Sequence, residues 1–223
     1  MRKARLLLGL ALAACASPLK PLPPPEAGAG TEDAAALAAQ SRAATKKAQH
    51  EPSGDARREL AQQALQAGQR CQQAAPTSAA CDYALALALG VQAREQPTTA
   101  TQGLPLMVKL LQKANQEDAR LDSAGPERVL ALVLVRAPGW PLGPGDVDAG
   151  LEAARKAVAL FPDYAPNQLA LSEAFLVAGD ESSSQVAARR GLELARSAAA
   201  AGEADAQDWV RDGEGLLSGK APR

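Results

Sequence analysis

Apolar residues recur along most of this chain at steps of three and four, which places them on one face of an α-helix. The clearest run contains five such residues: Val147, Leu151, Ala154, Val158 and Phe161. Asp146 precedes it as a helix N-cap and Pro162 stops it. The same spacing predicts further helices over Glu32–Gln49, Asp55–Ala75, Ser78–Arg94, Gly103–Glu117, Ser123–Arg136, Pro166–Ala178, Glu181–Ala201 and, more briefly, Asp205–Leu217.

Two stretches also fit the alternation of a β-strand. From Tyr83 to Leu89 leucines alternate with alanines, and Val129 to Val135 is rich in branched residues. The first stretch has no polar face to alternate against, because the intervening residues are Ala. In the second, Leu130, Val133 and Leu134 also fit a buried helix. We therefore predict helices in both places.

The composition points to closely packed helices. Aromatic residues make up 3% of the chain, while alanine is abundant throughout. Alanine is the best helix former and a poor strand former. The predicted helix that begins at Pro166 carries two apolar stripes, as a helix does when it lies between neighbours in a stack. The predicted fold is therefore all-α, an array of helical hairpins of the α-solenoid kind.

The segment Lys156–Asp163 resembles the end of a tetratricopeptide repeat, where a small residue precedes a Pro that stops the helix. In that register Leu171, Phe175 and Gly179 occupy the motif's Leu, aromatic and turn positions. The resemblance has three departures: Gln168 replaces the consensus Trp, Ser172 replaces a Gly, and the Pro expected after Leu194 is absent. A second junction of this kind runs from Cys71 to Pro76 and is followed by Tyr83 and Leu85.

A Pro- and Gly-rich loop, Ala137–Asp146, precedes that repeat and carries a single Trp. Together with Glu152–Asn167 it resembles the T component associated with periplasmic TRAP transporters, over roughly Gly125–Ala195. That family consists of helical lipoproteins of the tetratricopeptide type. The resemblance implies a non-catalytic role: binding or handing over a ligand beside a solute-binding protein and a permease.

The N-terminus resembles a bacterial lipoprotein signal. Basic residues at Arg2, Lys3 and Arg5 precede the apolar run Leu6–Leu12, and Ala13 and Ala14 precede Cys15. The resemblance implies that Cys15 is lipidated after cleavage. An ordinary signal peptide that contains a Cys is the alternative. The apolar run is shorter than the roughly 20 residues that a membrane-spanning helix needs.

The organisation that follows has three parts: a signal peptide at 1–14, a lipidated Cys with a Pro/Gly-rich linker at 15–31, and a helical domain at 32–218. Prolines favour an extended linker, so the domain would stand clear of the headgroups. Ala16 occupies the place where Asp would favour retention in the inner membrane. We therefore expect the periplasmic face of the cell envelope, with the outer membrane favoured over the inner.

Two cysteines, Cys71 and Cys81, remain in a chain expected to enter an oxidising compartment. They lie at the ends of two successive predicted helices, with Pro76 between them. The ends of a helical hairpin come close enough for a disulfide. The alternative is a pair of reduced, buried thiols.

The sequence offers little for catalysis, a metal, a cofactor or nucleic acid. The only histidine, His50, lies in a predicted loop, so neither a histidine-based triad nor a multi-histidine metal site can form. Gly139, Gly143 and Gly145 lack the strand and the Lys of a phosphate-binding loop. The formal net charge is −1, and basic residues do not cluster with aromatics. We predict a non-enzymatic protein without a cofactor.

Five residues are candidates for contact with a ligand or partner: Trp140, Tyr164, Phe175, Gln168 and Tyr83. Trp140 stands out because Pro138, Pro141 and Pro144 restrict its loop, and rigid aromatics make good anchors. The alternative for Trp140 is a plug that fills the gap left by a long connection. The aromatic side chains of Tyr164 and Phe175 also fit contacts between repeats.

The predicted function is a membrane-anchored binding or adaptor component, accessory to solute transport of the TRAP type. Its partner would be a solute-binding protein, and its ligand a small hydrophobic molecule or an organic acid. The alternative is a pilotin-like or scaffold lipoprotein that helps to assemble an outer-membrane secretin, pilus or motility complex. A closed, dry, apolar cavity favours the first function, and a polar groove open along the array favours the second.

Overall fold

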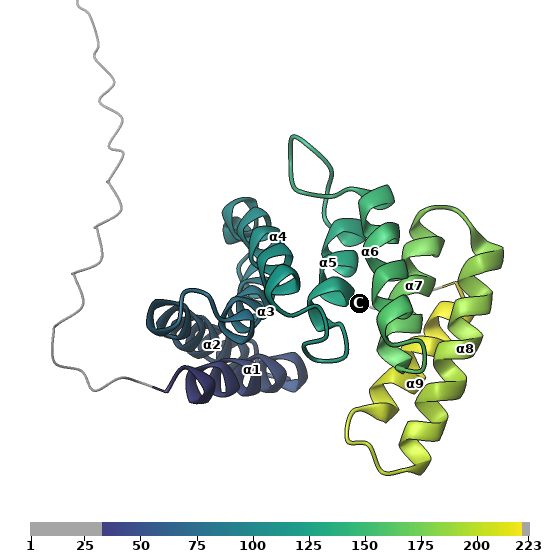
Figure 1. The fold of residues 1–223 in the computed structure, drawn as a ribbon, viewed down its shortest axis with the longest axis horizontal. Coiled ribbons are helices and arrows are strands. Elements are labelled where there is room, and N and C mark those ends of the chain that lie inside the picture. Colours follow the sequence, from purple (N-terminus) through teal and green to yellow (C-terminus); the bar gives the residue numbers. More distant parts are fainter. Residues whose placement is uncertain (1–32, 220–223) are drawn as a thin grey trace, which may run out of the picture. The chain divides into compact units, whose positions relative to one another are not determined.

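The computed structural model describes residues 33–219, and the regular elements in that range are helices (Figure 1). The signal peptide, Cys15 and the Pro/Gly-rich linker lie outside the described residues. Among the described residues no helix is both long and apolar enough to cross a membrane. The helices are Ala34–His50 (α1), Gly54–Ala74 (α2), Ala79–Glu95 (α3), Pro97–Thr99 (η1, a 3₁₀ turn), Ala100–Glu117 (α4), Gly125–Arg136 (α5), Val147–Leu160 (α6), Ala165–Val177 (α7), Glu181–Ala200 (α8) and Ala206–Leu217 (α9).

Helices that follow one another in sequence pack side by side (Figure 1). They form four antiparallel hairpins, α1–α2, α3–α4, α5–α6 and α7–α8, and α9 then packs on α8. The first helices of successive hairpins also touch, α1 with α3, α5 with α7, and α7 with α9. This arrangement confirms the all-α array of helical hairpins predicted from the sequence and fits the tetratricopeptide type of repeat.

Side-chain caps explain where several helices begin. Asp33, Asp146 and Asp180 each accept a hydrogen bond from a backbone N–H in the first turn of α1, α6 and α8, at 2.9–3.0 Å. These bonds satisfy donors that have no partner inside the helix. The C-terminal end of α7 is marked by a glycine. Gly179 has a φ of 82°, a left-handed conformation that glycine adopts without strain.

Small residues let the helices approach one another closely. Gly191 on α8 packs against Leu169 on α7, and a Cβ at position 191 would lie 2.6 Å from a Leu169 methyl carbon. Ser172 takes the place of the consensus Gly and is fully buried, with its Oγ 2.9 Å from the carbonyl oxygen of Ser184. With Ser172 in place of the consensus Gly, α7 and α8 still pack closely, and a hydrogen bond is added between them.

Both stretches with an alternative strand pattern are helical, Tyr83–Leu89 within α3 and Val129–Val135 within α5. Three helix starts differ from the prediction by two or three residues. Helix α1 begins at Ala34 instead of Glu32, directly after the capping residue Asp33. Helix α4 begins at Ala100 instead of Gly103, directly after η1. Helix α5 begins at Gly125 instead of Ser123, because residues 122–124 all have positive φ angles of 51–64°. Such a left-handed run cannot continue as an α-helix, so it separates the second hairpin from the third.

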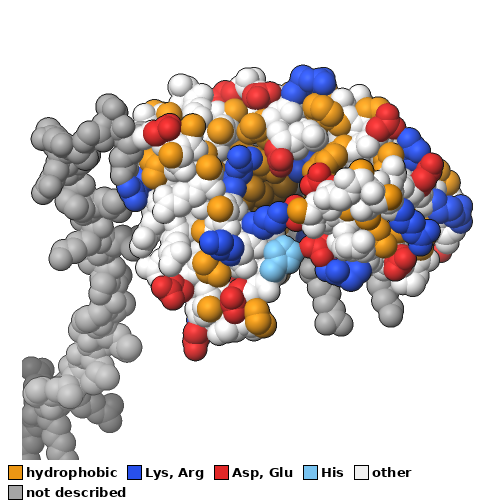
Figure 2. Space-filling view, turned by 90° about the horizontal axis from the view of Figure 1, so that it is seen from below, with side chains coloured by type: hydrophobic (Ala, Val, Ile, Leu, Met, Phe, Trp, Pro, Cys, Tyr) orange, Lys and Arg blue, Asp and Glu red, His pale blue; other side chains and the backbone are white. Residues whose placement is uncertain are grey.

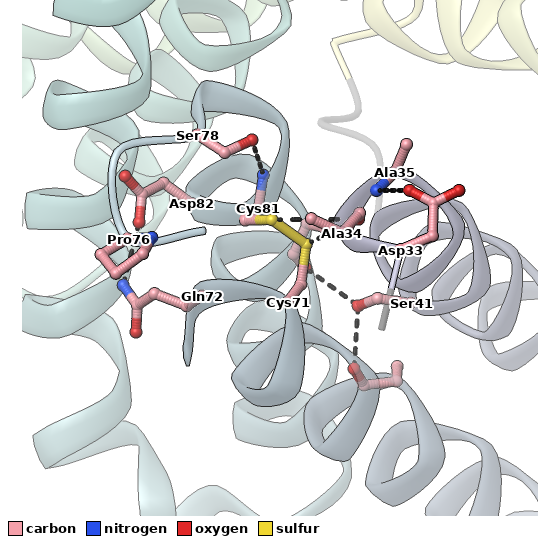
Figure 3. The surroundings of a disulfide bond; sticks show 12 residues. Asp33, Ala34, Ala35, Ser41, Cys71, Gln72, Pro76, Ser78, Cys81 and Asp82 are labelled. Carbon is pink, nitrogen blue, oxygen red and sulfur yellow. Dashed lines mark hydrogen bonds between the residues drawn. A yellow bond between two sulfur atoms is a disulfide. The ribbon is translucent and has the colours of Figure 1, made fainter. Parts of the chain in front are cut away.

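A disulfide joins Cys71 on α2 to Cys81 on α3, which confirms the predicted pairing (Figure 3). The two Cα atoms lie 5.3 Å apart, and both side chains are fully buried. Figure 3 shows the first turn of α1 beside the sulfurs, and Sγ of Cys71 lies 3.1 Å from the carbonyl oxygen of Ala34. The bond therefore joins two hairpins at the point where α1 covers them.

The buried carboxylate of Asp82 lies one residue beyond this disulfide (Figure 3). It accepts a hydrogen bond from Gln72 Nε2 at 2.9 Å and pairs with Lys113 Nζ at 2.7 Å. These partners belong to α2 and α4. Because a buried charge is tolerated only when it is paired, Asp82 ties three consecutive helices together.

The first and the last helix also meet. Lys46 Nζ on α1 lies 2.6 Å from Asp205 Oδ1, beside the start of α9, and His50 Nε2 lies 3.7 Å from Asp208 Oδ2. The Lys46 and Asp205 side chains are partly exposed, so this pair contributes on the order of 0.5 kcal/mol. The array thus bends enough for its two ends to form direct contacts.

Reversing the charge at this contact tests it. We expect Lys46→Asp to lower the free energy of unfolding by about 0.5–1 kcal/mol at low salt, because it places a second carboxylate beside Asp205. The double variant Lys46→Asp/Asp205→Lys should recover most of that loss. Urea denaturation at low and high salt provides the measurement, since salt screens exposed pairs. Equal destabilisation by the single and double variants would contradict the contact.

Candidate functional site

A groove of about 190 Å³ runs between α5, α7 and α9, and we call it the α5–α7–α9 groove. Apolar and charged side chains both line it. Its lining residues are Arg128, Leu132, Arg136, Pro166, Leu169, Ala170, Glu173, Trp209 and Asp212. The first helices of hairpins supply most of this surface, which is where arrays of this kind present binding faces.

The space-filling view shows a hollow with hydrophobic side chains inside it and charged side chains around its edge (Figure 2). The chain's single histidine lies beside this hollow (Figure 2). That residue, His50, contacts Asp208 on α9. Trp209 and Asp212 of the groove follow Asp208 within one turn of α9. The contact between the two ends of the array therefore lies near the α5–α7–α9 groove.

The arginines of this groove are already bound to the protein. Arg136 binds Glu173 through two hydrogen bonds of 2.6 Å each, and Glu173 is 2% exposed. Arg128 donates to Asp122 and Asn167. Partial burial raises the pKa of the Asp212 carboxyl, and the Arg136 guanidinium opposes that change. The groove thus has no uncommitted cation that would hold the carboxylate of an organic acid.

Gln168 and Phe175, two of the predicted residues, share a second groove of about 420 Å³ between α7 and α8, the α7–α8 groove. It is mostly apolar and open, and Val186 on its wall is 65% exposed. The Gln168 side chain donates to the carbonyl oxygen of Pro162 at 2.8 Å, so the amide is anchored by the chain. The Arg155 guanidinium lies 5.4 Å from the Phe175 ring centroid.

Tyr83 lies away from both grooves, in a buried polar cluster between hairpins. Its ring is 2% exposed, and its hydroxyl donates to Asp122 Oδ2 at 2.8 Å. Burial raises the pKa of Tyr83 above its ordinary value. A side chain without accessible surface cannot contact a partner. The predicted binding role of Tyr83 is therefore replaced by a structural one: it joins α3 to the turn before α5.

Tyr164 belongs to the same junction. Its ring meets Trp209 edge to face at 5.5 Å between centroids, and the Arg128 guanidinium lies 5.2 Å from the ring. Trp209 lines the α5–α7–α9 groove. Tyr164 thus supports a residue of that groove from behind, consistent with the alternative prediction of a contact between repeats.

Trp140 is 90% exposed and Leu142 is 73% exposed in the loop between α5 and α6. The alternative prediction, that Trp140 fills a gap between helices, is therefore wrong. Backbone hydrogen bonds close the base of the loop, from Gly145 N to the Pro138 oxygen and from Asp146 N to the Leu134 oxygen, both at 2.9 Å. Trp140, Tyr164 and Phe175 do not line one shared cavity.

Gly145 allows this loop to close on itself. A Cβ at position 145 would lie 2.1 Å from the carbonyl oxygen of Ala137, so only glycine fits there. The closed base and the three prolines hold two large apolar side chains in water. This is the arrangement expected of an anchor that a partner covers.

The sequence analysis missed a third groove, between α4, α5 and α6, which contains the buried carboxyl group of Glu127. Glu127 lies in the first turn of α5, where an acidic residue is common, so its position carried no signal of this groove. Among the described residues, no three His, Cys, Asp or Glu side chains gather closely enough to hold a metal ion. We describe this α4–α5–α6 groove below.

The described part of the chain defines a class, an all-α array of helical hairpins with open grooves. This class serves many binding functions and does not imply a particular one. No protein-family model matches this chain, and no curated protein matches it significantly. The particular function therefore has to be argued from the sequence motifs and from the geometry above.

Proposed function

We propose that this chain is a lipid-anchored, non-catalytic adaptor of the bacterial cell envelope that binds a protein partner. The lipoprotein-like sequence before Cys15 supports the anchor. The Pro/Gly-rich segment after it supports a spacer between the anchor and the helical domain. The hairpin array supplies the binding surfaces, as it does in other proteins built from such repeats.

The exposed pair Trp140 and Leu142 carries this proposal. Exposing two large apolar side chains at the tip of a closed loop is unfavourable in water, and a covering partner would relieve that cost. A loop already restricted by prolines loses little further entropy on binding. Central aromatic anchors of this kind dominate the energy of many protein interfaces.

The partner we propose is a solute-binding protein of the TRAP type. The support is the resemblance of Ala137–Asp146 and Glu152–Asn167 to the T component of those systems. The grooves described here are open, and the arginines of the α5–α7–α9 groove are committed to Glu173, Asp122 and Asn167. These features favour a protein partner over an organic acid held directly by this chain.

The second candidate function is a pilotin-like or scaffold role in the assembly of a secretin, pilus or motility complex. The openness of the α7–α8 groove supports it. The groove is more apolar than the polar groove expected for this role, and an amphipathic helix of a partner would cover Phe175 and Val186 together. In that role the α7–α8 groove would be the main interface, and the loop of Trp140 a peripheral contact.

Crosslinking in intact cells, followed by affinity capture and mass spectrometry, separates the two functions. Reproducible recovery of a solute-binding protein or a TRAP permease would support the transport role. Recovery of a secretin, pilus or motility component would contradict it and support the assembly role. Val186→Asp should abolish capture in the second case and leave it unchanged in the first.

Trp140→Ala provides the residue-level test. We expect recovery of the partner to fall at least 10-fold, since truncating a central aromatic anchor costs about 2 kcal/mol or more. The melting temperature should stay within about 1 °C of the wild type, because the side chain packs against little. Leu106→Ala, on exposed α4 surface, is the matched control. Unchanged capture by Trp140→Ala would refute the anchor.

A further inference from the structure

The α4–α5–α6 groove has a volume of about 450 Å³ and lies where the second hairpin meets the third. Its floor is aliphatic, and its walls carry amide and charged groups. The lining residues are Gln112, Asn115, Gln116, Glu127, Leu130, Leu134, Ala149, Glu152, Ala153 and Lys156. On α5 these residues occupy a different face from the one that lines the α5–α7–α9 groove, so the two sites are separate.

Glu127 is the most unusual residue of this groove. It is 5% exposed, and one carboxylate oxygen, Oε1, accepts a hydrogen bond of 2.6 Å from Asn115 Nδ2. Its other oxygen, Oε2, accepts no hydrogen bond from the described residues and is not fully buried, so it is accessible from the groove. Burial raises the pKa of this carboxyl group, with partial opposition from Lys156.

The other buried carboxylates among residues 33–219 are paired. Asp82 has Lys113 at 2.7 Å, and Glu173 has Arg136 at 2.6 Å. Burying a carboxylate without a cation is costly, and such a charge is normally compensated. Glu127 is the exception, and it faces an open groove instead of the protein core. The missing cation can therefore come from outside the chain.

A second acceptor close to Glu127 also lacks a donor. The side-chain oxygen of Asn115, Oδ1, is buried and has no hydrogen-bond partner, although the amide nitrogen of the same side chain binds Glu127. Native proteins leave few buried acceptors unsatisfied. Two neighbouring acceptors without donors indicate that a group rich in N–H belongs at this place.

Lys156 does not fill this role, because its ammonium lies 2.7 Å from Glu152 on the same helix. Glu127 and Glu152 together carry two negative charges, and Lys156 supplies one positive charge. The groove therefore lacks one positive charge. The aliphatic side chains of Leu130, Leu134 and Ala153 offer a surface for a methylene chain.

We propose that the α4–α5–α6 groove binds an aliphatic primary ammonium group, held at Glu127 with its methylene chain on the floor of the groove. An ammonium ion is compact and offers three donors. A guanidinium fits less well, because its two-pronged geometry needs both oxygens of a carboxylate and Asn115 already occupies one. The ammonium can belong to a free diamine or to a lysine side chain of a partner protein.

Isothermal titration of the mature chain with 1,5-diaminopentane, at low salt, tests the site. We expect saturable binding to the wild type and at least 10-fold weaker binding to Glu127→Gln, because hydrogen bonds to charged groups contribute about 1.5–3 kcal/mol. Glu59→Gln, at an exposed position on α2, is the matched control and should bind like the wild type. 1-Pentanol, which has the chain without the charge, should not bind.

A second probe distinguishes the source of the ammonium. The second probe is lysine acetylated at its α-amine and methylamidated at its carboxyl group, with a free ε-amine. If this probe binds more tightly than the diamine, and its ε-acetylated form does not bind, the ligand is a partner's lysine. Tighter binding of the diamine identifies a free amine. Absence of saturable binding for both probes, or equal binding by Glu127→Gln and the wild type, would overturn the proposal. Circular dichroism of Glu127→Gln confirms that the variant is folded.

Discussion

Replacing Asn167 with Asp will lower the free energy of unfolding by about 3 kcal/mol, although the two side chains have nearly the same shape. Asn167 is completely buried at the start of α7. Its amide nitrogen lies 3.1–3.2 Å from the carbonyl oxygens of Ser123, Ala157 and Phe161. A carboxylate oxygen in that place would face these acceptors with no hydrogen to offer, which leaves buried acceptors unsatisfied.

The loss can be measured by urea denaturation, with the midpoint and slope fitted separately. Asn167→Ala should be similarly destabilised, by about 2–4 kcal/mol, because it removes the same bonds and leaves a small void. Gln185→Glu, an exposed amide-to-acid change on α8, is the control and should alter stability by less than about 0.5 kcal/mol. If the Asp variant were as stable as the wild type, the hydrogen bonds donated by the Asn167 amide would contribute nothing to the free energy of unfolding.

Replacing both Cys71 and Cys81 with Ser should destabilise the domain by about 2–3 kcal/mol. The bond closes a short loop, with a sequence separation of 10, and the chain-entropy model gives a contribution of that size for it. For a domain of this length the melting temperature should fall by roughly 5–10 °C. Differential scanning calorimetry gives the measurement.

The comparison with reduced wild-type protein controls for the substituted side chains. A reducing agent should lower the melting temperature of the wild type by a similar amount and leave the double Ser variant unchanged. If the reducing agent had no effect on the wild type, the disulfide would contribute nothing to stability. If the double Ser variant melted at a lower temperature but the reduced wild-type protein did not, the loss would come from the packing of the sulfurs beside Ala34 and not from the cross-link.

Local patterns were sufficient to predict the helices. The run from Val147 to Val158 repeats at helical spacing, and Asp146 caps it as expected. The Cys71–Cys81 pair could also be predicted, because both residues lie beside the short turn between two successive helices. These features depend on interactions over a few residues, and such interactions can be read from sequence.

Polar contacts between distant segments could not be predicted in this way. In the sequence, Tyr83 resembles any other aromatic residue of an apolar helix. Its hydroxyl nevertheless donates a hydrogen bond to Asp122, 39 residues away. The left-handed turn at 122–124 contains no glycine, so its sequence gives no sign of it. The Arg128 guanidinium joins that turn to Asn167, again 39 residues away.

Exposure was equally hard to predict for the candidate binding residues. A Trp in a Pro-rich loop fits a buried plug as well as an exposed anchor, and only the closed base at Gly145 settles its position. Glu127 follows a Pro at the start of α5 and reads as an ordinary charge in a first helical turn. Its burial depends on α4 and α6, which pack over it from outside α5.

The contact between Lys46 and Asp205 joins residues 159 positions apart, and this separation has a consequence for folding. Each hairpin can form from local contacts, but this contact has to wait until the intervening helices are docked. During synthesis α9 emerges last, so the first helix has no terminal neighbour until the whole domain has been made. Truncation before Asp205 should therefore yield a folded but fraying array, with faster hydrogen exchange at the end of α1.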